Sequence, residues 1–135
     1  MKKLDGRTAI VTGAAQGIGF AISSALNREG CRVALLDINE QKVQESAAKL
    51  DACIGISCDV SSPESIERAA ALCVEEYNGV DIVVNNAGIL PSASIEQMTE
   101  EQWDKTMQIN LKSVFFMVQK TLPYLRQSSC ARIIN

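Results

Sequence analysis

The sequence predicts an α/β fold in which helices cover both faces of a parallel β-sheet. Short, continuous apolar runs alternate along the chain with segments of helical period, and such runs are typical of strands that are buried on both faces. Strands that alternate with helices need right-handed crossovers, which leave the strands parallel. The length of 135 residues and an apolar content of 47% suit a single domain over 1–135 with a sizeable core.

The strands and helices follow in the order βαβαβαβαβ. The first strand is expected at 8–12, where an apolar run lies between Gly6 and Gly13. Similar runs predict the other strands at 32–37, 53–59, 80–86 and 132–135. Helical periodicity predicts helices at 17–29, about 40–50, about 62–77 and, as one long element, 99 to about 127.

Two of the predicted helices begin at a recognisable capping signal. Ser61 with Glu64, and Thr99 with Gln102, have the spacing of a capping box, in which side chains bond the first free backbone groups of a helix. These signals place the starts of the third and fourth helices.

Charge and composition exclude several classes of function. The net charge is -3 with scattered basic residues, so we expect neither nucleic acid nor a membrane as a partner. Asp5 and Arg7 stand where a signal peptide needs an apolar stretch, and no apolar run reaches the roughly 20 residues of a spanning helix. We therefore expect a cytoplasmic protein.

The reactive side chains are cysteines rather than histidines. Five cysteines are scattered without a C-x-x-C pair, and no histidine is present. This pattern argues against a disulfide framework and a metal site, and it excludes imidazole acid–base catalysis. We expect the cysteines to be free and mostly buried.

The ends of four predicted strands carry the candidate site residues. In an open parallel sheet, ligands bind outside the carboxyl ends of the strands. The first strand ends at Gly13, the second at Asp37, the third at Asp59, and the fourth in the sequence Asn-Asn-Ala-Gly at 85–88. Four such ends together predict a ligand site at this edge.

The segment 12–19, Thr-Gly-Ala-Ala-Gln-Gly-Ile-Gly, predicts a phosphate-binding turn. Its glycines permit a tight turn, a close approach of backbone to pyrophosphate, and close packing of helix on strand. The free N–H groups of the following helix would face the phosphates. The predicted binding residues are Gly13, Gln16, Gly17, Ile18 and Gly19. A purely structural turn is the alternative.

Asp37, which lies 18 residues after Gly19, predicts binding of the ribose of an adenosine. Its carboxylate can accept hydrogen bonds from both ribose hydroxyls and would repel a 2′-phosphate. The glycine turn itself carries no Arg or Lys, so the sequence favours NAD over NADP. The alternative is that Asp37 caps the helix that starts after Asn39.

The third and fourth strand ends each have a ligand-binding interpretation and a structural alternative. Asp59 would face the adenine amino group and Val60 the adenine ring, unless Asp59 only caps the next helix. Asn86, Ala87 and Gly88 would let backbone pass close to a ligand, unless they form a plain turn.

Asn110 is unusual because it lies within the long predicted helix, beside an apolar face that we expect to be buried. That face comprises Met107, Leu111, Val114, Phe115 and Val118. A polar group there needs water, backbone or a catalytic group as its partner, so Asn110 is a candidate catalytic residue. A bridge between neighbouring elements is the alternative.

Together these motifs resemble the classical short-chain dehydrogenases/reductases over 4–135. The segments 12–19, 59–60, 85–88 and 109–111 are similar to that family's glycine turn, adenine pair, Asn-Asn-Ala-Gly and helix Asn motifs. The resemblance implies a Rossmann-like, doubly wound, three-layer α/β/α fold with strand order 3-2-1-4-5 that binds NAD(P). It also implies hydride transfer between nicotinamide and an alcohol or carbonyl substrate, with Asn110 in a proton relay through water.

The family's acid–base pair, Tyr-x-x-x-Lys, is not found in this sequence. Four residues after Tyr77 stands Asp81, and four residues after Tyr124 stands Ser128. The resemblance covers roughly the first half of a family member, so we expect the C-terminal part of the fold to be missing. We then expect an open fifth strand, marginal stability alone, and a homo-oligomer. The alternative function is a non-catalytic dinucleotide-binding or interaction module.

Overall fold

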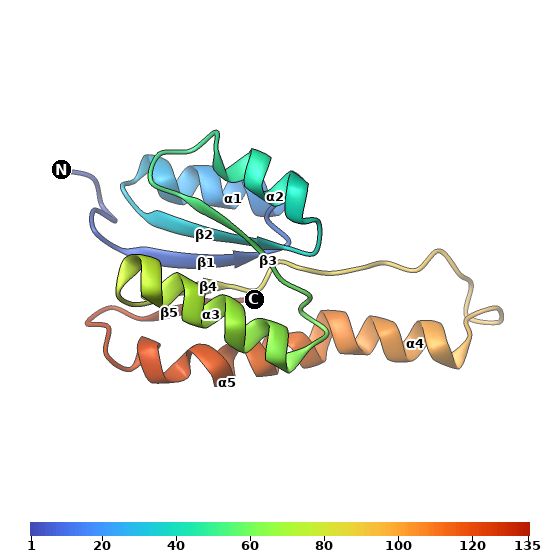
Figure 1. Cartoon of the computed structure of the whole chain (residues 1–135). Helices are drawn as coiled ribbons and strands as arrows, with labels where there is room; N and C mark the ends of the chain where they lie inside the picture. The colour runs from blue at the N-terminus through green and yellow to red at the C-terminus, as the bar shows by residue number, and fades with distance from the viewer.

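A five-stranded parallel sheet lies between two layers of helices in the computed structural model, which describes residues 1–135 (Figure 1). The strands are β1 (Thr8–Thr12), β2 (Arg32–Asp37), β3 (Ile54–Ser57), β4 (Ile82–Val84) and β5 (Arg132–Ile134). Their order is β3-β2-β1-β4-β5, as predicted. β5 pairs only with β4, and its residues are exposed, which confirms the expected open edge.

Apolar clusters cover both faces of the sheet. Helices α1 (Gly17–Arg28) and α2 (Glu40–Ala47) lie on one face, and α3 (Pro63–Tyr77) and α5 (Ser113–Leu125) lie on the other (Figure 1). The cluster beneath α1 and α2 includes Val11, Val33, Leu35, Val43 and Ala47. The cluster beneath α3 and α5 includes Ile10, Leu36, Ile66, Met117 and Leu125. Neighbouring strand residues thus enter opposite clusters, which is why the runs are continuously apolar.

Of the two predicted helix caps, the one at the start of α4 is confirmed and the one at the start of α3 is wrong. Thr99 and Gln102 form the predicted capping box. The N-cap of α3 is Ser62, whose hydroxyl accepts a backbone N–H of the first turn at 3.2 Å. The predicted capping residue Ser61 is wrong, because its hydroxyl donates to the Asp59 carboxylate at 2.7 Å instead.

The long predicted helix is divided into three parts. It comprises α4 (Glu100–Met107), the π-helical segment η1 (Gln108–Lys112) and α5. A π-helical turn holds an extra residue, and such turns are frequent at functional sites. The prediction of one continuous α-helix was therefore wrong at η1, the segment that contains Asn110.

The apolar face predicted on this helix is not buried. Met107, Leu111 and Phe115 are 37%, 59% and 60% exposed, and α4 has no buried residue. Figure 1 shows the reason, because α4 and the segment before it reach beyond the sheet, where no other element covers them. The residues of α5 that are buried instead are Ser113, Met117, Thr121 and Leu125.

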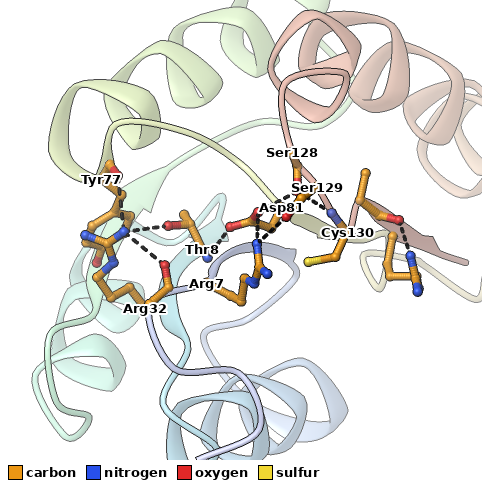
Figure 2. A network of polar contacts seen from close by, with 11 residues as sticks. Arg7, Thr8, Arg32, Tyr77, Asp81, Ser128, Ser129 and Cys130 are labelled. Atoms are coloured by element: carbon orange, nitrogen blue, oxygen red, sulfur yellow. Dashed lines mark hydrogen bonds and ion pairs between the residues drawn. The ribbon is translucent and has the colours of Figure 1, made fainter.

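A polar network ties the strands together at their amino ends (Figure 2). The Asp81 carboxylate accepts the Thr8 N–H at 2.9 Å, the Ser128 hydroxyl at 2.5 Å, and an Arg7 N–H at 3.3 Å. A pocket of about 470 Å³ at this edge is lined by these residues and by Arg32, which lies over the Tyr77 ring. This pocket lies at the opposite edge from the predicted site.

The network predicts a specific dependence of stability on pH. Burial by itself would raise the pKa of Asp81, but hydrogen bonds from Ser128 and Thr8 and the Arg7 guanidinium outweigh it and lower that pKa. A lowered folded-state pKa gives stability that is present above the unfolded value, about 3.9, and lost as pH falls through the folded value.

We expect Asp81→Asn to flatten the fall in the free energy of unfolding between about pH 5 and pH 3, and to cost about 1–2 kcal/mol at pH 7. Chemical denaturation at a series of pH values measures both effects. Asp5→Asn, at an exposed position near the same edge, is the matched control and should leave the curve unchanged. Parallel curves for the unchanged chain and Asp81→Asn would contradict the assignment.

Candidate functional site

Residues from four strand ends meet at the carboxyl edge of the sheet. They line a pocket of about 180 Å³, smaller than the roughly 300–1,000 Å³ of sites for drug-sized ligands. The predicted residues in its lining are Gly13, Asp37, Asp59, Val60, Ala87 and Gly88. Sequence reasoning missed four others, which are Ile38, Cys58, Ile89 and Ile109. The pocket is therefore suited to one part of a larger ligand.

The glycines of the turn differ in their surroundings, and two of them have the packing and turn roles that the sequence suggested. A Cβ on Gly19 would lie 2.2 Å from the Gly13 carbonyl oxygen, so α1 could not approach β1 with any side chain there. Gly13 has φ +62°, and a Cβ on it would lie 3.0 Å from the Ala87 Cα. Gly17 has φ +57° and faces open space. The turn thus combines tight packing with an open side.

The N-terminus of α1 has free backbone donors. Gln16 occupies the N-cap position without a side-chain hydrogen bond to the helix, and the first turn contains no acidic residue. The first N–H groups of a helix lack intrahelical partners and carry a partial positive charge. Ile18, in this turn, is 74% exposed. The arrangement fits the backbone cradle expected for a pyrophosphate.

Two side chains fix the Ala15 peptide within the turn. Its N–H donates to the Asp37 carboxylate at 3.1 Å, and its carbonyl accepts the Ser46 hydroxyl at 2.7 Å. Ser46 lies on α2 and is buried. The turn is therefore held between the end of β2 and α2. The contact of Ser46 with the turn was not predicted from the sequence, although a buried polar side chain on a helix needs a hydrogen-bond partner.

Asp37 does not cap α2. Asn39 is the N-cap, and its side chain accepts the Lys42 N–H at 3.0 Å. The second oxygen of the Asp37 carboxylate accepts the Asn39 N–H at 3.1 Å. The alternative role of Asp37 as the helix cap is therefore wrong. A carboxylate has about four lone-pair sites, so Asp37 retains acceptor capacity for a ligand.

Thr12 joins the ends of β1 and β4. Its hydroxyl oxygen accepts the N–H groups of Asn86 and Ala87 at 3.0 and 2.9 Å. The Asn86 side-chain amide donates in return to the carbonyls of Thr12 and Gly13 at 3.0 and 3.2 Å. Residues 85–94 form no turn, so the plain-turn alternative is wrong. The sequence analysis gave Thr12 no role of its own, although a hydroxyl at the end of a buried strand can bond the backbone of the neighbouring strand end.

Asp59 has a structural contact and a place in the pocket. Its carboxylate accepts the Ser61 N–H at 2.9 Å and thus shapes the approach to α3, while Ser62 caps that helix. Together with Val60 it lines the pocket. Both residues thus lie at the carboxyl edge of the sheet, and Asp59 also orders the loop before α3.

The cysteines are free. Cys31, Cys58 and Cys73 are buried, whereas Cys53 and Cys130 are partly exposed. Burial raises the pKa of both Cys31 and Cys73 to about 12. Burial also raises the pKa of Cys58, against a hydrogen bond from Ser65 that lowers it. Cys58 therefore contributes a neutral, apolar wall to the pocket.

Asn110 bonds to the backbone at the far side of the pocket. Its side-chain oxygen accepts the Ile89 N–H at 2.8 Å, and its amide donates to the Ile89 carbonyl at 2.8 Å. The backbone is thus the partner that this polar side chain required, and the amide bridges η1 to the chain after β4. One N–H and one acceptor lone pair of the amide remain available.

Comparison with known proteins identifies the family. Residues 7–135 match the family model for short chain dehydrogenase. The chain belongs to the short-chain dehydrogenase family. Its oxidoreductase relatives include D-threitol dehydrogenase of Mycolicibacterium smegmatis, to which it is 38% identical over 137 residues, or 98% of this chain and 53% of that protein. A second relative is sorbitol dehydrogenase of Cereibacter sphaeroides, 41% identical over 118 residues, or 87% of this chain and 46% of that protein.

Solved structures show the same fold. A crystal structure of a short-chain dehydrogenase/reductase described as glucose/ribitol dehydrogenase from Brucella melitensis has a TM-score of 0.88 and 33% identity. The similarity covers 93% of this chain and 54% of that one. The chain therefore spans about half the length of the short-chain dehydrogenases it matches. None of its helices has the length and apolar character needed to cross a bilayer.

The packing of α1 on β1 gives a direct test of the glycine turn. Alanine favours a helix over glycine by about 1 kcal/mol, yet the Gly19→Ala methyl would lie 2.2 Å from the Gly13 carbonyl oxygen. We expect Gly19→Ala to lower the free energy of unfolding by about 1–3 kcal/mol, as overpacking does. Chemical denaturation measures this change.

A matched variant on the exposed side of α1 is Ala21→Gly. It should cost about 1 kcal/mol through helix propensity alone and leave the turn intact, so amide chemical shifts at 13–19 should change only for Gly19→Ala. A Gly19→Ala chain as stable as the unchanged one would contradict the close-packing argument.

Proposed function

We propose that this chain is the cofactor-binding half of an NAD-dependent oxidoreductase that transfers a hydride between nicotinamide and an alcohol or carbonyl carbon. The observation that carries the proposal is the Asp37 carboxylate at the end of β2, bonded to the backbone of the glycine turn. It combines an acceptor for ribose hydroxyls with an adjacent backbone cradle for phosphate. Membership of the short-chain dehydrogenase family supports the reaction class.

The residues present fit such a dinucleotide. The open N-terminus of α1 would receive the pyrophosphate, since Gly17 leaves space and the backbone donors are free. Asp59 and Val60 would contact the adenine within the pocket. Ala87 and Gly88 also line the pocket, and their small size would let the protein backbone pass close to the ligand. The nicotinamide, when bound, supplies or accepts the hydride.

Asp37 favours NAD over NADP. A 2′-phosphate would stand beside its carboxylate, and two unit charges about 4 Å apart at an effective dielectric constant of about 20 repel by roughly 4 kcal/mol. The ribose hydroxyls of NAD would instead donate to that carboxylate, in bonds that contribute about 1.5–3 kcal/mol each.

Asn110 is proposed to hold a water molecule in the proton relay of the reaction. Its amide keeps one donor and one acceptor after bonding Ile89. In this proposal the same side chain positions the backbone that lines the cofactor pocket. The names of the threitol and sorbitol dehydrogenase relatives favour a polyhydroxylated alcohol, or its carbonyl product, as the substrate.

We further propose that the protein is a homo-oligomer. Trp103, Met107, Leu111 and Phe115 are exposed at four-residue spacing along α4, η1 and α5, and a stripe of this kind is unusual on a monomer. Asp104 and Lys112 flank a groove beside it. Antiparallel pairing of two copies would place these opposite charges near one another.

The first test is an NAD titration by calorimetry, comparing the unchanged chain with Asp37→Ala. We expect the variant to bind NAD about 10- to 100-fold more weakly, because it loses bonds to a charged acceptor. Asp51→Ala, at an exposed position in another loop, is the matched control and should bind normally. Equal affinity in the unchanged chain and Asp37→Ala would remove the role given to that carboxylate.

The second test addresses association. Leu111→Glu places a charge in the exposed stripe and should shift the sedimentation coefficient from that of an oligomer to that of a monomer. Leu72→Glu changes a 44% exposed leucine on α3 and should leave the oligomer intact. A monomeric unchanged chain, or an unaltered Leu111→Glu oligomer, would rule out this surface as the interface.

A further inference from the structure

The pocket at the amino edge of the sheet has no part in the proposed cofactor site. Its volume of about 470 Å³ exceeds the 180 Å³ of the pocket at the carboxyl edge, and it lies within the roughly 300–1,000 Å³ of sites for small molecules. The two pockets share no lining residue. The lining of this amino-edge pocket includes Arg7, Thr8, Arg32, Tyr77, Asp81 and Ser128.

The Arg32 guanidinium is held in place at the wall of the amino-edge pocket. Its Nη2 group donates to the Thr8 hydroxyl at 3.2 Å and to the carbonyls of Tyr77 and Gly6 at 3.3 and 3.4 Å. The guanidinium also lies over the Tyr77 ring, with its Cζ 5.2 Å from the ring centroid. Gly6, Thr8 and Tyr77 all line the pocket. The charged group therefore stands at the pocket and would lose little freedom when a ligand binds.

The charge and two of the donors of Arg32 are not used within the protein. Arg7 pairs with Asp81, and the only other ion pair joins α3 to α5, so no carboxylate neutralises the Arg32 guanidinium. Its Nε is buried without a hydrogen-bond partner, whereas its Nη1 has no partner in the protein and is not buried. Leaving a buried donor unmatched costs free energy. Arg32 thus has capacity for an anion that the protein itself does not supply.

The other charged groups of the pocket balance one another. Arg7 lies 3.3 Å from the Asp81 carboxylate, which also accepts the Thr8 N–H and the Ser128 hydroxyl (Figure 2). Arg32 is the one remaining charged residue of the lining, so the pocket carries one net positive charge. This balance favours an anion with a single charge. The planar fork of a guanidinium matches the two oxygens of a carboxylate.

The uncharged part of the lining suits a ligand that carries hydroxyl groups. Asn78, Tyr124 and Gln127 contribute amide and hydroxyl groups, and these groups can both donate and accept hydrogen bonds. Val74 and Val80 are the only aliphatic side chains of the lining. An apolar ligand would leave the polar groups unmatched, at a cost in free energy, whereas hydroxyls would bond them.

We propose that the amino-edge pocket is a second ligand site, which binds a small hydroxylated carboxylate such as a sugar acid. Arg32 receives the carboxylate, and the amide and hydroxyl groups of the lining bond the hydroxyls of the ligand. This site lies at the opposite edge of the sheet from the proposed cofactor site. Its occupation is therefore independent of whether the chain binds NAD.

The first test locates the ligand in the unchanged protein by nuclear magnetic resonance. D-Gluconate and D-gluconamide are suitable probes, because they share their hydroxyls and differ in the charge of the terminal group. In the intact protein, gluconate should shift the backbone amide resonances of residues 6–8 and 77–81. Gluconamide should bind at least about fivefold more weakly, because it lacks the charge-assisted bonds. Unshifted resonances at 6–8 and 77–81, or equal affinities for the two probes, would overturn the proposal.

The second test changes Arg32 and measures gluconate binding by calorimetry. Arg32→Met should weaken binding by at least about tenfold, and Arg32→Lys, which keeps the charge without the planar fork, by about threefold to fivefold. Arg28→Met, at an exposed position on α1, is the matched control for loss of an arginine charge and should bind normally.

Circular dichroism would establish that each of these variants is folded. If Arg32→Met does not fold, Arg32→Lys provides the comparison. Unchanged affinity in the folded Arg32 variants, or an equal loss in Arg28→Met, would show that Arg32 does not receive the carboxylate and would overturn the assignment.

Discussion

The approach of α1 to the end of β1 is the constraint on which the candidate site depends. No side chain fits between Gly19 and the Gly13 carbonyl, so the distance between helix and strand is set by backbone contact. The apolar cluster beneath α1 and α2 maintains that contact, since Val11, Leu35 and Val43 are fully buried. Close-packed interiors yield little to local displacement. The free donors of α1 are consequently held in one place.

Hydrogen bonds from three other elements then arrange the backbone around this contact. Asp37 and Ser46 hold the Ala15 peptide from β2 and α2. Thr12 and Asn86 join β1 to the chain after β4. Groups already fixed by their neighbours lose little freedom when a ligand binds, which favours affinity. Asp37 and Asn86, which have predicted binding roles, thus also hold the backbone of the candidate site in place.

The sequence predicted best the elements whose residue pattern is determined by burial, namely the strands. Continuous apolar runs predicted the five strands because the sheet is covered on both faces, and the strand ends then located Gly13, Asp37, Asp59 and Asn86 at one edge. The predicted limits of β3 and β4 were too wide. Cys58 and Val80 are buried apolar residues that lie just outside these strands, so burial alone did not mark the strand ends.

The remaining features depend on contacts between distant segments. Ser46 acquires its role only because α2 lies beside the glycine turn. The exposed stripe at Met107, Leu111 and Phe115 was expected to be buried, because apolar periodicity does not distinguish a core face from a face left open beyond the sheet. The π-helical turn was not foreseen, since its extra residue has no signature in hydrophobic periodicity.

The π-helical segment sets the position of Asn110 without changing the course of the helix. Deleting one residue within Gln108–Lys112 would remove the extra residue of the wide turn, so α4 and α5 would continue as one ordinary α-helix in nearly the same relative orientation. The deletion would act locally instead, because the backbone at Asn110 would tighten and the two bonds between its amide and Ile89 would be displaced. In this family member, one added residue therefore moves a single side chain while the packing on either side is kept.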